Sequence, residues 1–288
     1  MPMLHKWHGT IQLIHMALAE DEIAYDPTSS LMPDDLMSEA YLMAKADGVL
    51  AGVDIALEVF RQVDPDLEFN TYLKDGSTLA KGIYIASIHG KMQSILRAER
   101  TALNFIQRMS GIATATNEFV TKVNGLKAQV IDTRKTIPGW RLLDKYSVRM
   151  GGGHNHRMST GDGILIKDNH IAAMATRGES MTQLIYRAKV EAAHTIRVEV
   201  ECDTLEQVQE AVNAGADIIL FDNMTPEQMR KAVQICSGKA LTEASGGITI
   251  DTVRDVAETG VDLLSTGSIT HSVKALDISL EVRPQEQS

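Results

Sequence analysis

Short apolar runs alternate with amphipathic segments over the second half of the chain. The runs are "AQVIDTRK", "GILIKDNH", "IRVEVEC", "DIILFDN", "ALTEASGG" and "VDLLSTGS", and each ends in polar residues. The last four centre near residues 198, 219, 242 and 263, which are 21 to 23 residues apart. Buried strands that alternate with helices at this spacing predict a parallel α/β sheet with right-handed crossovers. Because six strands are too few to close a (β/α)8 barrel, we predict an incomplete, open barrel with another domain over the gap.

The segments between these runs carry signals for helix boundaries. Thr204 in "TLEQ" and Thr225 in "TPEQ" offer capping boxes, and Thr249 lies near the start of a third helical segment. Gly215 and Gly260 stand where helices are expected to end. These signals predict a helix after each of three successive strands.

The first part of the chain has a mixed pattern. Apolar residues at helical spacing predict a helix around residues 11–18, and "EAYLMAKADGVLAGVDIALEVFRQV" predicts a strand, a turn at Gly48 and a helix from about Val53. "GIYIASIHG" predicts another strand. A long helix is expected over 94–123, with an apolar face made by Leu96, Leu103, Ile106 and Met109.

Composition narrows the functional classes. The net charge is −10, which argues against a surface that coats nucleic acid, and any anion site must be a local basic cluster. The two cysteines form no disulfide framework and indicate a reducing compartment. No apolar run is long enough to span a bilayer or to act as a signal peptide. We therefore expect a cytoplasmic protein without a nucleic-acid or membrane partner.

The carboxyl ends of the predicted strands carry an ordered set of polar residues. In barrels of this kind the active site forms at these ends. Basic residues follow the early strands, acidic residues the middle strands, and small hydroxyl residues flanked by glycine the last two. In chain order they are Arg134, Lys135, Lys167, Glu201, Asp222, Ser245 and Thr266. This order predicts one pocket that binds an anion on one side, a cation in the middle and a phosphate on the other side.

The glycine-rich loops "ASGGIT" and "STGSIT" follow the last two strands and precede expected helices. Backbone N–H groups uncovered by glycine at such positions bind phosphate well. Each loop alone is equally compatible with a tight strand-to-helix turn. Their occurrence at both final strands favours a phosphate site.

Glu201 and Asp222 are 21 residues apart, which is one strand–helix unit. Paired carboxylates bind Mg²⁺ together with substrate phosphates, or stabilise a cationic transition state. Solvated acids, or acids paired with nearby lysines, remain the alternative. Glu199 lies on the same face of its strand and ranks second as a site residue.

A basic segment covers residues 132–170. We expect some of its cations, such as Arg141 and Lys145, to be solvated. Others lie at strand ends or beside the glycine run "GGGHNHR", where an arginine can hold a carboxylate with two hydrogen bonds. His156 is predicted to donate a hydrogen bond to an anion, because two histidines without further ligands make a weak zinc signal. No nucleophile elbow, dinucleotide-binding loop or Walker A loop is present.

Several of these motifs together resemble the quinolinate phosphoribosyltransferase family, also called nicotinate-nucleotide pyrophosphorylase (carboxylating). They are "DTRKTIPGWRLLDKYSVRMGGGHNHRM", "ILIKDNHI", "VEVEC", "LFDNM" and "EASGGI", and the resemblance extends from about residue 44 to residue 282. It implies an α/β fold with an N-terminal α/β sandwich domain over 1–110, completed by segment 271–288, and an open-faced α/β barrel over 111–270. It also implies a reaction, in which quinolinate and phosphoribosyl pyrophosphate give nicotinate mononucleotide, pyrophosphate and CO₂, with Mg²⁺, in NAD synthesis.

The resemblance further implies a role for each matching residue. The implied quinolinate binders are Arg100, Arg134, His156, Arg157 and Lys167. The implied catalytic residues are Lys135, Lys167, Glu201 and Asp222, and the two acids are also the implied metal ligands. The implied phosphate-binding residues are Ser245, Gly246, Gly247, Thr266, Gly267 and Ser268.

Arg100 matches an arginine that the family supplies from the partner subunit, which implies a homodimer with shared sites, alone or within a higher oligomer. Two alternatives stay open. One is a related phosphoribosyltransferase that takes nicotinate or another small anion. The other is a non-catalytic barrel that binds a phosphorylated metabolite. Release of CO₂ distinguishes quinolinate from nicotinate as the substrate.

Overall fold

The computed structural model describes residues 4–283 and divides into two compact units. Unit 1 comprises Met1–Ala115, Arg149–Gly152 and Val273–Ser288, and unit 2 comprises Thr116–Val148 and Gly153–Ser272. Residues 1–3 and 284–288, which belong to the sequence segments predicted to build the first domain, lie outside the described residues.

Unit 1 is built around an antiparallel sheet with the strand order β12-β1-β5-β3. Its elements are η1 (Leu4–Lys6), α1 (His8–Glu20), η2 (Ile23–Tyr25), η3 (Ser29–Leu31), β1 (Met37–Ala44), β2 (Gly48–Val49), α2 (Val53–Val63), β3 (Glu68–Thr71), β4 (Thr78–Leu79), β5 (Tyr84–Lys91), most of α3 (Met92–Lys122) and β12 (Ile278–Arg283). Alternate residues of β1 are buried, so one face of the sheet meets the core. The last described strand of the chain therefore pairs with the first long one, at Ala44↔Ile278.

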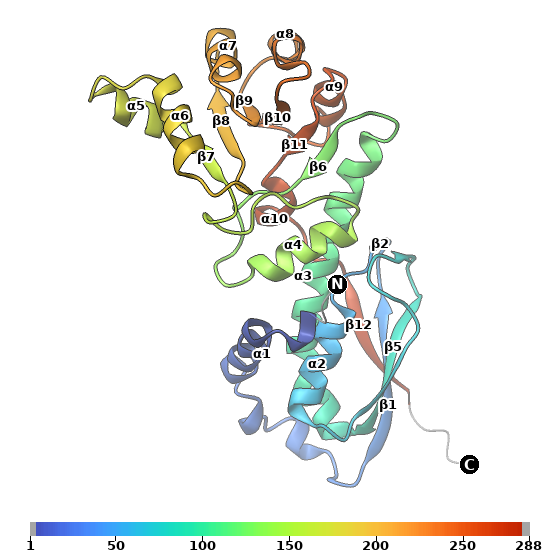
Figure 1. Ribbon diagram of the computed structural model, residues 1–288. Coiled ribbons are helices and arrows are strands. Elements are labelled where there is room, and N and C mark those ends of the chain that lie inside the picture. Colours follow the sequence, from blue (N-terminus) through green and yellow to red (C-terminus); the bar gives the residue numbers. More distant parts are fainter. Residues whose placement is uncertain (1–3, 284–288) are drawn as a thin grey trace. The chain divides into compact units, whose positions relative to one another are not determined.

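Unit 2 contains a parallel sheet of six strands in the order β6-β11-β10-β9-β8-β7. Its elements are β6 (Gln129–Ile131), α4 (Arg141–Met150, which ends in unit 1), β7 (Ile164–Ile166), α5 (Asp168–Ala175), α6 (Met181–Glu191), β8 (Val198–Cys202), α7 (Leu205–Asn213), β9 (Ile218–Asp222), α8 (Pro226–Cys236), β10 (Leu241–Ser245), α9 (Val253–Ala257), β11 (Leu263–Ser265) and α10 (Ser268–His271). The first strand pairs with the last, while β6 and β7 form the two edges. This arrangement confirms the predicted open α/β barrel (Figure 1).

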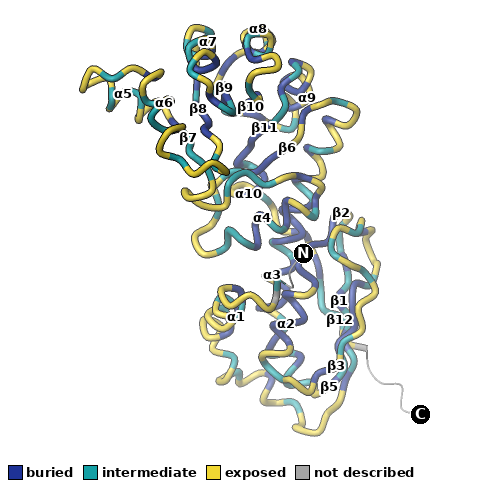
Figure 2. The backbone as a smooth tube through the Cα atoms, viewed as in Figure 1, coloured by how far each residue is buried: buried dark blue, intermediate teal, exposed yellow. Residues whose placement is uncertain are grey.

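Helices α7, α8 and α9 contact the strands of this sheet from outside, α7 on β8 and β9, α8 on β9 and β10, and α9 on β11. The strands are buried while the outward surfaces of these helices are exposed (Figure 2). Apolar runs such as Ile219–Phe221 are buried on both sides, which explains why they read as continuous rather than alternating.

The local boundary signals are mostly confirmed. Thr204 and Thr225 each accept a hydrogen bond from the backbone N–H three residues on, in a complete capping box. Gly215 and Gly260 follow helices with φ of 81° and 90°, a conformation that favours glycine. Thr249 does not cap, because α9 begins at Val253, four residues later.

Gly48 is not a turn residue, contrary to the prediction. It lies in the short strand β2, which pairs with β4 at Gly48↔Leu79. An added Cβ there would lie 2.6 Å from Thr114 Oγ1, so glycine is required by close packing. Among the described residues, no helix has the length and apolar character needed to cross a membrane.

Candidate active site

A cavity of about 590 Å³ opens at the carboxyl ends of the unit 2 strands. Many of the residues predicted from sequence line it, although they come from the ends of five strands and from the loop between α4 and β7. They are Arg134, Lys135, His156, Arg157, Lys167, Glu201, Asp222, Ser245, Gly246 and Gly247. The fold thus brings the basic, acidic and glycine-rich segments together around one space.

Four predicted residues do not line this cavity. Thr266 and Gly267 form the loop between β11 and α10, and Ser268 is the first residue of α10; the hydroxyls of Thr266 and Ser268 lie 2.9 Å apart. This loop borders Lys135, since an added Cβ on Gly267 would lie 2.9 Å from the Lys135 Cδ. Arg100 is an exposed residue of α3 in unit 1.

The two predicted acids occupy different levels of neighbouring strands. Glu201 pairs in register with Leu220, so Asp222 lies two residues closer to the carboxyl ends of the strands. The Glu201 Oε2 atom accepts a hydrogen bond from Lys167 Nζ at 2.9 Å, and Asp222 Oδ2 accepts one from Asn223 Nδ2 at 2.8 Å. Glu201 is therefore paired with Lys167 from the cationic side of the cavity. Pairing of an acid with a nearby lysine was one of the alternatives left open by the sequence.

His156 has both ring nitrogens engaged within the protein. Nδ1 accepts a hydrogen bond from the Arg157 backbone N–H at 2.7 Å, while Nε2 lies 3.2 Å from Glu199 Oε2 and 3.7 Å from Glu243 Oε2. Burial lowers the pKa of His156, but the hydrogen bond to Glu199 and the charges of Glu243 and Glu199 outweigh it, so the pKa is raised. An unprotonated Nδ1 and a proton on Nε2 satisfy both contacts. His154 is not part of this cluster and instead bridges to Ile131.

Glu243 is a cavity residue that the sequence interpretation missed. It lies on β10 two residues before Ser245, on the same face, and is 1% exposed. Burial raises its pKa to about 7, the nearby Glu199 charge adds to the rise, and His156 opposes it. Glu199 lies one layer deeper than Glu201 and is also buried. The sequence did hold a signal for Glu243, because alternate residues of a strand share a face and Glu243 lies two residues before Ser245.

Two cations expected to be solvated are not. Lys145 is 1% exposed and forms an ion pair with the fully buried Asp132. Arg141 is half-buried and donates hydrogen bonds to Thr136 Oγ1 and to the carbonyl of Met158. The helical pattern of α4 does not reveal that this basic face is covered by the segment that carries His156.

The loop after β10 has a left-handed backbone at two consecutive glycines. Gly246 and Gly247 have φ of 90° and 62°, and Asn223, after the neighbouring strand, has φ of 53°. The Asn223 N–H donates to the carbonyl of Ser245 at 3.2 Å, which ties the two strand ends together. Three left-handed residues, two of them consecutive, thus line the cavity at two adjacent strand ends.

Gly246→Ala is expected to raise the KM for phosphoribosyl pyrophosphate, the implied phosphate-bearing substrate, by about tenfold, because the loop must shift. The new Cβ would lie 2.2 Å from Asn223 Oδ1 and 3.0 Å from its backbone nitrogen. Gly247→Ala is the matched control, since it has a similar φ but no atom within 4 Å of the new Cβ. Steady-state kinetics that give both variants the same KM would contradict a role for the close approach at Gly246.

Comparison with known proteins gives consistent matches along the chain. The C-terminal domain model of quinolinate phosphoribosyl transferase matches residues 112–281, and the N-terminal domain model matches residues 26–110. A probable nicotinate-nucleotide pyrophosphorylase [carboxylating] of Bacillus subtilis is 43% identical, with 96% of this chain and 94% of the relative covered. A mitochondrial quinolinate phosphoribosyltransferase [decarboxylating] of Nicotiana tabacum is 38% identical, with 98% of this chain and 84% of the relative covered.

The solved structure of the nicotinate-nucleotide pyrophosphorylase from Francisella tularensis superposes with a TM-score of 0.90 at 38% identity, and the match covers 97% of this chain and 99% of that one. Both domain models, full-length relatives and a full-length structure thus agree with the motifs at the strand ends. The chain belongs to the quinolinate phosphoribosyltransferase family.

Proposed function

We propose that this protein transfers the phosphoribosyl group of phosphoribosyl pyrophosphate to quinolinate, with decarboxylation, to give nicotinate mononucleotide, pyrophosphate and CO₂. The observation that carries the proposal is the single cavity in which cationic, acidic and phosphate-cradling segments meet. A substrate with two adjacent carboxylates needs several cations, and a ribose phosphate needs the glycine loop. This combination also favours quinolinate over a substrate with one carboxylate.

The cationic side of the cavity would hold quinolinate. Arg134, Arg157 and Lys167 line this side. Arg157 is oriented by a hydrogen bond from Nη1 to the Gly163 carbonyl at 2.9 Å, so its remaining donors are available in a fixed plane. The ring nitrogens of His156 contact the Arg157 backbone N–H and the Glu199 carboxylate. We therefore propose that His156 acts by orienting the Arg157 main chain.

The acidic side would stabilise the sugar. Departure of pyrophosphate leaves positive charge on the ribose ring, and Glu201 and Asp222 are placed in the cavity to oppose that charge. The ring nitrogen of quinolinate then attacks the anomeric carbon, which the two clamped substrates hold in line. The resulting positive ring nitrogen stabilises the electron pair left on the adjacent carbon when CO₂ departs, and a proton then replaces the carboxylate.

The same acids suit Mg²⁺. Their donor atoms are carboxylate oxygens beside a phosphate-binding loop, which is the donor set that Mg²⁺ prefers when it shares substrate phosphates. When bound, Mg²⁺ would neutralise the charge of the departing pyrophosphate. Glu201 would then serve both Lys167 and Mg²⁺, because its Oε2 atom already forms an ion pair with Lys167 Nζ.

The proposal is tested by incubating the protein with quinolinate, phosphoribosyl pyrophosphate and Mg²⁺ and by measuring nicotinate mononucleotide and CO₂ together. Equal amounts of both products are expected. Conversion of nicotinate without CO₂ release would replace quinolinate by a substrate with a single carboxylate. A folded protein that converts neither substrate would leave a binding role for the barrel.

We also propose that the protein is a homodimer in which Arg100 serves the partner's cavity. Arg100→Ala and Lys135→Met subunits should each be inactive, whereas random mixing should restore about a quarter of wild-type activity, since half of the dimers then contain one intact site. The matched control mixes Lys135→Met with Asp222→Asn, two changes in the same cavity, and should restore nothing. Verified mixed dimers of Arg100→Ala and Lys135→Met without activity would argue against a shared site.

A further inference from the structure

A buried ion pair lies directly behind the cationic side of the cavity. Asp132 follows β6 and is fully buried, and Lys145 on α4 is 1% exposed. Neither residue lines the cavity. The Lys145 Nζ atom donates to Asp132 Oδ1, so each charge finds its counter-charge away from water.

The pair holds one residue of the cavity wall by both of its main-chain groups. The His156 N–H donates to Asp132 Oδ1 at 2.9 Å, and the His156 carbonyl accepts from Lys145 Nζ at 2.9 Å. Asn155 closes the arrangement, since its Nδ2 donates to Asp132 Oδ2 at 2.6 Å and to the Lys145 carbonyl at 2.8 Å. The segment 154–157 is thereby fixed to the end of β6.

A buried ion pair is a poor means of stabilising a fold. Removal of two charges from water costs as much as their attraction returns, and apolar residues of similar size often stabilise a core equally well. The pair instead positions the main chain, because its hydrogen bonds hold the His156 N–H and carbonyl in place. Here that main chain leads straight into Arg157, whose N–H donates to the His156 ring at 2.7 Å. Asp132 itself stands two residues before Arg134.

We infer that Asp132 and Lys145 are positioning residues for the dicarboxylate substrate, which set the separation between the segments that carry Arg134 and Arg157. The inference rests on the proposed function. Two carboxylates on adjacent ring carbons lie at a fixed distance, so two arginines bind both well only if their backbones are held at a matching distance. Main-chain hydrogen bonds join the end of β6 to the segment only as far as His154, and the ion pair extends this link to His156, the residue before Arg157.

The test compares Asp132→Asn, Lys145→Met and the double variant Asp132→Asn/Lys145→Met. Each single change leaves one buried charge unpaired and should lower the melting temperature strongly. The double change leaves none and should recover most of the loss. Its quinolinate Kd should nevertheless rise at least about tenfold, because the Arg134 and Arg157 segments lose their common anchor, while the KM for phosphoribosyl pyrophosphate stays within about twofold of wild type.

A milder variant covers the case in which the double variant does not fold. Asn155→Ala removes the amide bridge but keeps both charges, and it should raise the quinolinate Kd severalfold. The control is Lys127→Met/Asp262→Asn, which removes an ion pair at the amino ends of β6 and β11, away from the cavity, and should leave quinolinate binding unchanged.

The outcomes separate this inference from the function on which it rests. Wild-type protein that does not bind quinolinate overturns both. Wild-type protein that binds quinolinate, together with a folded double variant or Asn155→Ala variant of equal affinity, overturns the positioning role alone. An equal loss of affinity for both substrates would mean that the pair maintains the whole cavity, and this too overturns the inference.

Discussion

Lys135→Met is expected to lower kcat/KM for phosphoribosyl pyrophosphate by about a hundredfold or more, with little change in stability. The substitution keeps the apolar stem and removes only the ammonium group. That stem runs beside Gly267, and the Lys135 main chain is fixed at both groups, since its N–H donates to Thr133 Oγ1 and its carbonyl accepts from Thr270 Oγ1. We therefore expect the ammonium to serve the side of the cavity where the phosphates are expected, as a point charge.

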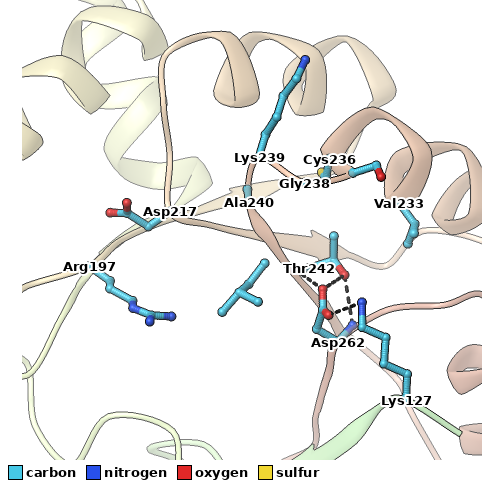
Figure 3. A pocket seen from close by; sticks show the side chains of 12 residues that line it. Lys127, Arg197, Asp217, Val233, Cys236, Gly238, Lys239, Ala240, Thr242 and Asp262 are labelled. Atoms are coloured by element: carbon cyan, nitrogen blue, oxygen red, sulfur yellow. Dashed lines mark hydrogen bonds and ion pairs between the residues drawn. The ribbon is translucent and has the colours of Figure 1, made fainter.

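Steady-state kinetics with each substrate varied in turn, beside a thermal melt, would measure this effect. Lys239→Met is the matched control, because Lys239 is an exposed lysine at the opposite, amino end of the sheet. Figure 3 shows it pointing away from the Lys127–Asp262 pair in a separate pocket. If Lys135→Met and Lys239→Met have the same kcat/KM, Lys135 has no role in catalysis.

Glu243→Gln is expected to reduce the pH dependence of the unfolding free energy by about 3 kcal/mol over the range from pH 4.5 to pH 7. Burial raises the pKa of Glu243 from 4.5 to about 7 in the folded protein. The groups that face it are Glu199 from β8, which raises the pKa further, His156, which lowers it, and Ser265 from β11, which hydrogen-bonds to it. The Glu199 Oε1 atom is buried and has no hydrogen-bond partner among residues 4–283, and a second negative charge beside Glu199 is unfavourable.

The sign follows from proton uptake. Between pH 4.5 and pH 7 the folded protein retains a proton that the unfolded chain has released, so the unfolding free energy falls as pH rises through this window. This contribution is complete below pH 4.5 and lost above pH 7. The glutamine variant has no such proton, so its curve should be flatter by the same amount.

Urea unfolding at several pH values between 4.5 and 8 would measure the difference between the two curves. Glu227→Gln, which changes an acid on α8 with a side chain that is 76% exposed, is the matched control and should follow the wild-type curve. Parallel curves for wild type and Glu243→Gln would show that Glu243 ionises in the folded protein as it does in the unfolded chain.

The local features of the barrel were readable from sequence because they depend on neighbours in the chain. The capping boxes at Thr204 and Thr225 involve residues three positions apart. The buried strands are recognisable in the sequence as continuous apolar runs, because both faces of a parallel sheet are covered. Thr249 shows the limit of such signals, because a threonine before a helical segment does not determine where the first turn starts.

The order of the strand ends also allowed the candidate cavity to be predicted. Arg134, Lys167, Glu201, Asp222 and Ser245 each follow or end a predicted strand, and parallel strands place those ends on one side of the sheet. Nothing beyond the strand–helix alternation was needed for this step. The family resemblance then added the chemical role of each residue, which geometry alone does not supply.

The sequence by itself therefore determined the α/β class, the six strands of the open barrel, the three-part composition of the cavity and the family. Only the tertiary structure decided that Lys145 is buried against Asp132, that His156 faces Glu199, and that Glu243 forms part of the cavity. The physical reason is the range of the interactions. Caps and apolar periodicity act within a few residues, whereas the burial of a charge depends on which distant segment covers it and supplies its counter-charge.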